Sequence, residues 1–209
     1  MKLGLTKRLE KVLSENNIKY TIYDKTVANP TTKNVAEAMD LFLSNNCNAI
    51  IGFGGGSSMD CAKAVGAKIA KPKQSLAKMK GILKVHKRIP LLIAVPTTAG
   101  TGSETTLAAV ITDAETRHKY AINDFPLIPR YAILDPKVTL SLPPFITATT
   151  GMDALTHAVE AYIGNSTTYG TRMDALKAVE LIFENIDTVY TDGKNEEARK
   201  KMLHASFYA

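Results

Sequence analysis

The spacing of apolar residues alternates along the chain between a helical repeat and short continuous runs, and this pattern predicts the order of the elements. Helical periodicity covers residues 5–16, a stretch capped by Thr31 or Thr32 that runs to about residue 45, a stretch from the turn 54–57 to about residue 70, and the chain from Pro144 onward. Apolar and β-branched runs predict strands at 20–23, 49–53, 91–95, 107–112, 118–122 and 131–134. The fourth and fifth of these strands are expected to form a hairpin. Strands that alternate with helices are typical of an α/β fold with a parallel sheet.

The pattern changes at residues 141–144, after which only helices are predicted. We therefore expect an α/β domain over residues 1–143 and the start of a helical domain over residues 144–209. Residue 1 falls where a helix begins, and the last helical stretch carries no stop signal. Both domains are accordingly expected to be truncated, the first at its N-terminus and the second at its C-terminus.

Composition and charge exclude several classes of protein. With 45% hydrophobic and 22% charged residues, the chain resembles ordinary globular proteins, and no apolar run approaches the roughly 20 residues that span a bilayer. No signal peptide is evident, and the two cysteines, Cys47 and Cys61, are expected to be small buried residues in a cytoplasmic protein. The net charge is +6, and residues 71–88 carry no acid. A nucleic-acid surface there is one interpretation, but the stretch has no aromatic residue for base stacking, so a solvated loop is favoured.

Two loops that follow expected strands carry groups suited to a phosphate or a sugar. The loop 54–57, Gly-Gly-Gly-Ser, opens a helix whose first N–H groups favour an anion. It departs from the dinucleotide fingerprint, because Ser57 replaces the third glycine and no acid follows about 20 residues later. The loop 96–104 offers hydroxyl groups and glycines. The alternatives are a plain tight turn in the first loop and hydroxyls that satisfy their own backbone in the second.

A carboxylate and an imidazole form a third candidate site. Asp153 and His157 lie four residues apart in a helical segment, so both side chains share one helix face and could bind one metal ion. Two ligands do not complete a metal site. The alternative is an Asp in the first turn of a helix, where the helix dipole favours it without any metal.

Three motifs in this order are similar to those of the iron-containing (group III) alcohol dehydrogenases. They are Gly-Gly-Gly-Ser-x-x-Asp at 54–60, Pro-Thr-Thr-Ala-Gly-Thr-Gly-Ser-Glu at 96–104 and Gly-Met-Asp-Ala-Leu-Thr-His-Ala-Val-Glu-Ala-Tyr at 151–162. The resemblance runs through essentially the whole chain. It implies a Rossmann-like parallel-sheet nucleotide-binding domain followed by the start of an all-helical metal-binding domain, an architecture shared with dehydroquinate synthase.

The resemblance also implies roles for particular residues. Asp153 and His157 match two of the metal ligands of the family. The residues that the resemblance assigns to the nucleotide are Asn29, Gly55, Gly56, Ser57, Asp60, Thr97, Thr98, Thr101 and Lys119.

The activity implied is hydride transfer between a small alcohol or aldehyde and NAD or NADP at a divalent metal, Fe²⁺ or Zn²⁺, in a homo-oligomer with no nucleic-acid or membrane partner. The resemblance places two further histidine ligands after residue 209 and an acid for the ribose before residue 1. We therefore expect residues 1–209 alone to be inactive. The alternatives are a non-catalytic remnant or interaction fragment and a dehydroquinate synthase-like lyase.

Overall fold

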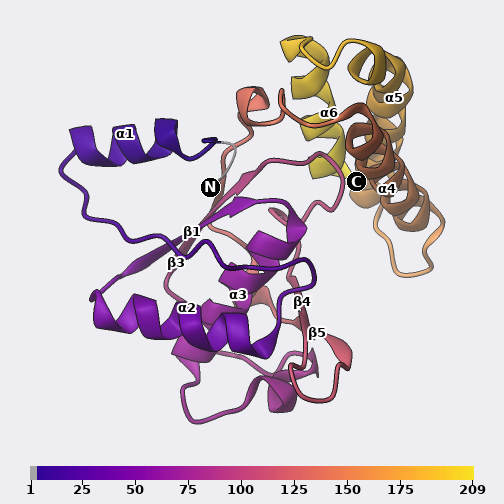
Figure 1. The fold of residues 1–209 in the computed structure, drawn as a ribbon. Coiled ribbons are helices and arrows are strands. Elements are labelled where there is room, and N and C mark those ends of the chain that lie inside the picture. Colours follow the sequence, from indigo (N-terminus) through magenta and orange to yellow (C-terminus); the bar gives the residue numbers. More distant parts are fainter. Residues whose placement is uncertain (1–3) are drawn as a thin grey trace. The chain divides into compact units, whose positions relative to one another are not determined.

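The computed structural model describes residues 4–209, which form two compact units (Figure 1). The first unit contains the chain up to residue 53 together with residues 57–94 and 106–131. The second contains residues 54–56, 95–105 and 132–209. These units are made of several chain segments, so they do not test the single domain boundary expected after residue 143. That boundary stays a prediction. The expected start of the α/β domain at residue 1 lies outside the described residues.

Helices and strands alternate until residue 132, and helices follow. The elements of this first part are α1 (Lys7–Glu15), α2 (Thr32–Ser44), β1 (Ala49–Gly54), α3 (Gly56–Ala70), η1 (Leu76–Met79), β2 (Gly81–Ile82), β3 (Leu91–Pro96), β4 (Ala108–Thr112), β5 (Lys119–Asn123), η2 (Phe125–Leu127) and β6 (Tyr131–Ala132). One sheet has the order β1-β3-β6 and the other β2-β5-β4. In the second sheet β4 and β5 form the predicted hairpin, with Val110 opposite Ala121. The α/β class with a parallel sheet is confirmed.

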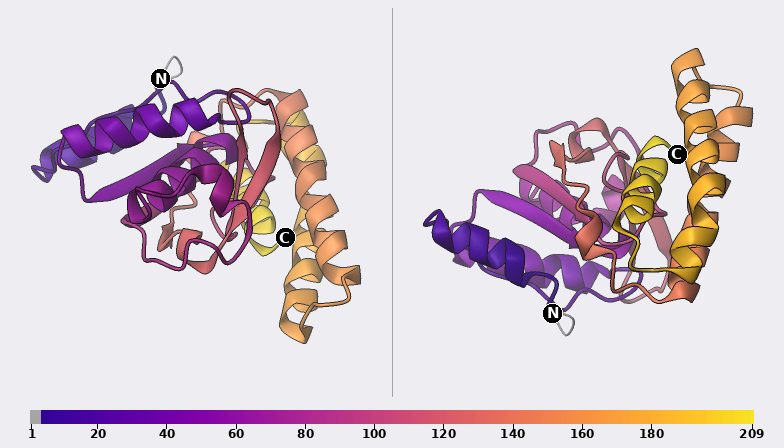
Figure 2. Two further views of the ribbon diagram at one scale, coloured as in Figure 1. Left: turned by 90° about the horizontal axis from the view of Figure 1, so that it is seen from below. Right: turned by 90° about the horizontal axis from the view of Figure 1, so that it is seen from above.

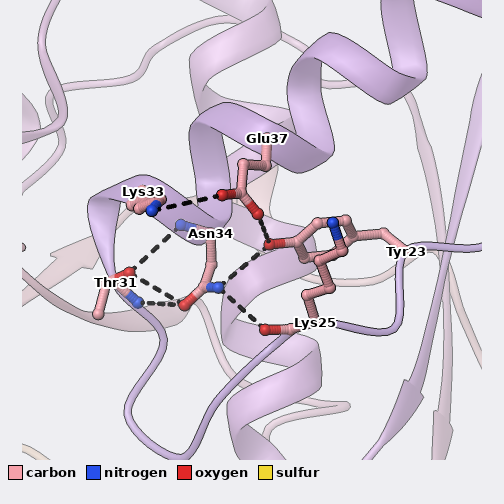
Figure 3. Close-up of polar contacts among 6 residues, drawn as sticks. All are labelled: Tyr23, Lys25, Thr31, Lys33, Asn34 and Glu37. Carbon is pink, nitrogen blue, oxygen red and sulfur yellow. Dashed lines mark hydrogen bonds and ion pairs between the residues drawn. The ribbon is translucent and has the colours of Figure 1, made fainter.

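Helix α2 begins at a reciprocal cap made by Thr31, one of the two capping residues that the sequence predicts. The Thr31 hydroxyl accepts a hydrogen bond from the Asn34 backbone N–H at 3.3 Å, and Asn34 Oδ1 accepts one from the Thr31 N–H at 3.0 Å (Figure 3). Both bonds satisfy donors that the helix itself leaves free. The predicted α1 and α3 are likewise confirmed.

The strand predicted at residues 20–23 is wrong. This segment joins no sheet. Side chains of α2 bind it instead (Figure 3). The Tyr23 hydroxyl donates to Glu37 Oε2 at 2.8 Å, while Asn34 Nδ2 donates to the Tyr23 hydroxyl at 3.1 Å and to the Lys25 carbonyl at 3.0 Å. Burial, reinforced by Glu37, raises the pKa of Tyr23 to about 12, so the hydroxyl remains a donor at neutral pH.

The strand predicted at residues 131–134 is shorter than expected. Strand β6 ends at Ala132, and a 3₁₀ turn, η3 (Pro136–Val138), begins soon afterwards. The Asp135 carboxylate caps this turn by accepting a hydrogen bond from the Lys137 N–H at 3.0 Å. This local cap bends the chain away from the strand direction.

The core of the first unit contains a fully buried lysine. Apolar residues of α2, α3, β4 and β5 form one cluster there. Lys63 of α3 has no exposed surface, and its ammonium donates to the Thr106 carbonyl at 2.7 Å, to the Thr106 hydroxyl at 3.0 Å and to the Ala108 carbonyl at 2.9 Å. These bonds tie α3 to the first residues of β4. A buried charge is tolerated when its donors are satisfied in this way.

The second unit is built on three helices, α4 (Pro144–Ile163), α5 (Tyr169–Thr191) and α6 (Glu196–Tyr208), which lie side by side (Figure 2). They pack through small residues: a Cβ placed on Gly151 would lie 3.0 Å from Ile186 Cδ1. Arg199 of α6 is 3% exposed and donates to the Thr147 hydroxyl at 2.7 Å, which joins α6 to the first turn of α4. Within residues 4–209, no helix is both long enough and apolar enough to cross a lipid bilayer.

Replacing Lys63 by Met tests the buried lysine. We expect the Lys63→Met variant to lose about 2–4 kcal/mol of unfolding free energy, because two carbonyls and a hydroxyl lose the buried ammonium that they bind. Urea denaturation followed by circular dichroism measures this change. The control is Lys73→Met at an exposed lysine, which is expected to change stability by less than about 0.5 kcal/mol. Equal stability of the two variants would contradict a stabilising role of the Lys63 hydrogen bonds.

Candidate nucleotide and metal site

The loop after β1 and the loop after β3 lie against each other in the second unit. Residues 54–56 and 95–105 both belong to that unit, and the Thr97 N–H donates to the Gly54 carbonyl at 2.9 Å. This bond extends the pairing of the two strands into the loops. The structure thus brings together the two segments in which the sequence predicted nucleotide contacts.

Two glycines of the first loop leave room for two threonines of the second. A Cβ on Gly55 would lie 3.3 Å from Thr98 Oγ1, and a Cβ on Gly56 would lie 2.9 Å from both Oγ1 and Cγ2 of Thr101. Rotation of the Thr101 side chain does not relieve the second contact, because its Cβ would also lie 3.2 Å away. The backbone at Gly56 is also the start of α3, where unpaired N–H groups and the helix dipole favour an anion. The first turn of α3 contains no acid that would compete for these groups.

A second group of predicted residues lies together in the first unit. The Asn29 backbone N–H donates to the Ser57 hydroxyl at 3.2 Å, and the Lys119 ammonium donates to Asn29 Oδ1 at 2.8 Å. Asn29 has a φ of +54°, a conformation that Asn tolerates better than most residues. Asp60 lies one turn after Ser57 on α3. The group combines a cation, an amide and a hydroxyl, which are suited to the polar parts of a nucleotide.

The predicted metal pair lies on one face of α4. Asp153 Oδ1 is 3.9 Å from His157 Nε2, and the two side chains are 46% and 41% exposed. The alternative explanation, an Asp in a first helical turn, is wrong, because α4 begins at Pro144. A carboxylate and an imidazole suit Zn²⁺ or Fe²⁺, but the part of the chain that the structure describes contains no group of three or more potential ligands. Asp153 and His157 are therefore donors of the type that binds such a metal. Two donors are fewer than a four-coordinate site needs.

One contact in this region has no counterpart among the sequence predictions. Gly100 lies directly against the backbone of α4, since a Cβ there would be 2.6 Å from the Thr150 carbonyl oxygen. The sequence shows Gly100 only as one of two glycines in a polar loop. Its partner is 50 positions away, and no local pattern links the two residues.

The thiols do not contribute to the candidate site. Cys61 lies in the core of the first unit and is 3% exposed, whereas Cys47 is partly exposed. Burial raises the pKa of the Cys61 thiol to about 11. The expectation of a buried residue therefore holds for Cys61 and only partly for Cys47.

Both parts of the chain match descriptions of one protein family. Residues 1–136 match "Iron-containing alcohol dehydrogenase", and residues 147–209 match "Fe-containing alcohol dehydrogenase family, C-terminal". The chain is 41% identical over 208 residues to alcohol dehydrogenase 4 of Schizosaccharomyces pombe, covering 99% of this chain and 49% of that protein. It is 38% identical over 206 residues to the NAD-dependent methanol dehydrogenase of Bacillus methanolicus, covering 99% and 54%. The chain therefore spans about half the length of these curated relatives.

Solved structures agree with these matches. An alcohol dehydrogenase from Oenococcus oeni superposes with a TM-score of 0.95 at 35% identity, covering 100% of this chain and 54% of that one. Sulfoacetaldehyde reductase from Bifidobacterium kashiwanohense, solved in complex with NAD⁺, superposes with a TM-score of 0.88 at 34% identity, covering 99% and 55%. The Rossmann-like α/β architecture followed by helices is thereby confirmed.

The two thiols should differ in reactivity with DTNB. In the native protein at pH 8, we expect Cys47 to react and Cys61 to remain protected until the chain unfolds, because its thiolate fraction is about one in a thousand at that pH. A Cys61→Ser control should leave the native reaction unchanged and halve the number of thiols titrated in urea. Two thiols reacting at one rate in the native protein would contradict the prediction.

Proposed function

Because the chain belongs to the iron-containing alcohol dehydrogenase family, we propose that it serves reversible hydride transfer between an alcohol and NAD or NADP at a divalent metal. The observation that supports this most is the fit of the loop after β1 to a dinucleotide. Gly55 and Gly56 lie at the N-terminus of α3, which favours an anion, and a Cβ on either would meet Thr98 or Thr101. Such a cradle suits a pyrophosphate, which needs close backbone approach more than side-chain contacts.

Each residue group has a distinct part in the proposed binding. The Gly55 and Gly56 backbone and the N-terminus of α3 hold the pyrophosphate, and the hydroxyls of Thr98 and Thr101 orient the adjoining portion of the nucleotide. The Lys119 ammonium, held by Asn29, adds a positive charge to the nucleotide-binding residues of the first unit.

Asp153 and His157 supply two donors for the metal on α4. The nicotinamide supplies a hydride acceptor, and the metal, Fe²⁺ or Zn²⁺, supplies positive charge that lowers the pKa of an alcohol hydroxyl. Because two donors do not complete a four-coordinate site, we propose that residues 1–209 alone bind metal weakly and turn over alcohol little or not at all.

The substrate that we propose is a small alcohol or the corresponding aldehyde. Relatives include proteins named as dehydrogenases of methanol, choline and 1,3-propanediol, so the alcohol differs among similar chains. We assign no particular alcohol. The same proposal includes a homo-oligomer in the cytoplasm.

Nucleotide binding by the 209-residue chain tests the proposed function. We expect saturable binding of NADH or NADPH in isothermal titration calorimetry, and at least about tenfold weaker binding by Gly56→Ala, whose added methyl occupies the space beside Thr101. The matched control is Gly170→Ala on α5, where a Cβ would meet only Thr168 Oγ1 at 3.7 Å. A wild-type chain that binds neither nucleotide would favour the non-catalytic remnant.

Removing the imidazole tests the metal pair. We expect weak, saturable Zn²⁺ binding by the wild-type chain and loss of this binding in His157→Ala, because a single carboxylate remains. The control is His86→Asn, which changes an exposed histidine at a φ of +52° to another residue that tolerates this conformation. Equal Zn²⁺ affinity of the His157→Ala variant and the wild type would exclude the pair as a metal site.

A further inference from the structure

Helix α5 has an exposed apolar face on the side away from its packing against α4 and α6 (Figure 2). Its buried residues are Ala175, Ala178, Leu181, Ile182, Asn185 and Val189. On the other side, large apolar residues recur every seven positions, which is about two helical turns, at Tyr169, Leu176, Phe183 and Tyr190. Tyr169 is 80% exposed and Phe183 is 68% exposed. Single exposed apolar side chains are ordinary, but a row of four on one face indicates a surface that binds another protein.

The charged residues beside this row are separated by sign along the helix. Arg172 and Lys177 lie in the N-terminal half of α5, and Glu184 and Asp187 lie in the C-terminal half. All four are exposed. Two copies of α5 that lie side by side in the same direction would bring like charges together. Two copies in opposite directions bring the basic half of each against the acidic half of the other, which is the favourable arrangement.

The apolar row matches itself in one antiparallel register. A twofold axis that crosses α5 between residues 179 and 180 places Tyr169 of one copy against Tyr190 of the other. The same axis places Leu176 against Phe183 of the other copy. Each contact occurs twice, because a twofold axis uses the same patch on both copies. All four apolar residues of the row therefore meet an apolar residue of the other copy.

The same register also pairs the charges. It places Arg172 of one copy against Asp187 of the other, again at both ends of the contact. Glu180 lies beside the axis, where two copies bring their carboxylates together. Because Lys177 Nζ is 2.8 Å from Glu180 Oε2, each copy brings an ion pair to this point rather than an isolated negative charge. At 3.6 residues per turn, Asp174 lies on another side of the helix and does not enter the contact.

We propose that α5 is an interface between two copies of this chain, in which the two α5 helices lie antiparallel about a twofold axis at residues 179–180. The occupant of the exposed face is a second copy because one register satisfies both the apolar row and the charges. A single pair of helices is a small interface, so the expected dissociation constant of the dimer is on the order of 10 µM. The inference gives an interface to the proposed homo-oligomer, and it requires neither nucleotide nor metal.

The first test follows dimerisation of the 209-residue chain by analytical ultracentrifugation between about 1 and 200 µM. For the wild type we expect a monomer–dimer equilibrium within this range. Phe183→Glu should raise the dissociation constant at least about tenfold, because it places a carboxylate against Leu176 of the other copy. The matched control is Phe145→Glu on α4, where the phenylalanine is 72% exposed. The control should retain the wild-type dissociation constant, and circular dichroism checks that both variants keep the helix content of the wild type.

The second test uses charge reversal to examine the register. Arg172→Glu and Asp187→Lys, each studied alone, should raise the dissociation constant at least about fivefold, because like charges then face each other at both ends of the contact. An equimolar mixture of the two variants should recover the wild-type affinity, because opposite charges face each other again in the mixed dimer. Both changes place a charge that the helix dipole favours near an end of α5, so neither is expected to impair folding.

Three results would overturn the inference. The first is a wild-type chain that stays monomeric throughout the range, which would mean that solvent or a different protein covers the exposed face of α5. The second is an equal effect of Phe183→Glu and Phe145→Glu. The third is a mixture of the charge variants that dimerises no better than either variant alone. Titration with NADH separates this inference from the proposed function, because a monomer that binds NADH contradicts only the α5 interface, and an α5 dimer that binds no NADH contradicts only the proposed nucleotide site.

Discussion

The close approach of Gly100 to the Thr150 carbonyl is the constraint on which the arrangement of the second unit depends. A Cβ at Gly100 would lie nearer to its neighbour than a Cβ at any other glycine that the structure describes. The approach lets Ala99 enter the helical core, where α4 and α5 also meet through small residues such as Ala158 and Ala175. Close packing of this kind leaves few alternative arrangements, because interiors tolerate neither voids nor overlap. The loop after β3 is therefore part of the helical core as well as a flank of the candidate nucleotide site.

In the first unit, a buried charge joins two elements. Lys63 belongs to a residue type that is rarely buried, yet its three donors are all used and its acceptors are two carbonyls and a hydroxyl. The bond joins α3, whose first turns contain Ser57 and Asp60, to the beginning of the hairpin that carries Lys119. A polar network of this kind holds two elements that carry predicted site residues in one geometry, which apolar packing alone does less specifically.

Predictions from sequence succeed here where the determining contact is local. The cap of α2 involves Thr31 and Asn34, three residues apart, and the hairpin β4–β5 is specified by the short segment between its strands. The strand expected at 20–23 fails because a strand exists only with a neighbour, and in this structure Tyr23 bonds to side chains of α2. The burial of Lys63 and the role of Gly100 depend on partners 43 to 50 positions away. No periodicity reports such contacts.

The same distinction applies to the candidate site. The glycine loop alone is equally compatible with a tight turn, and only the distance from Gly56 to Thr101 shows that its lack of side chains is required for packing as well as for any ligand. The Asp153–His157 pair, in contrast to the two glycines, contributes little to the stability of the fold. It lies in the middle of α4, where the helix dipole offers no stabilisation, and an exposed pair at this spacing contributes about 0.3–0.5 kcal/mol at most. Folding therefore gives little reason for an acid and an imidazole to share that face, whereas the proposed role of the two side chains as metal ligands would give a direct one.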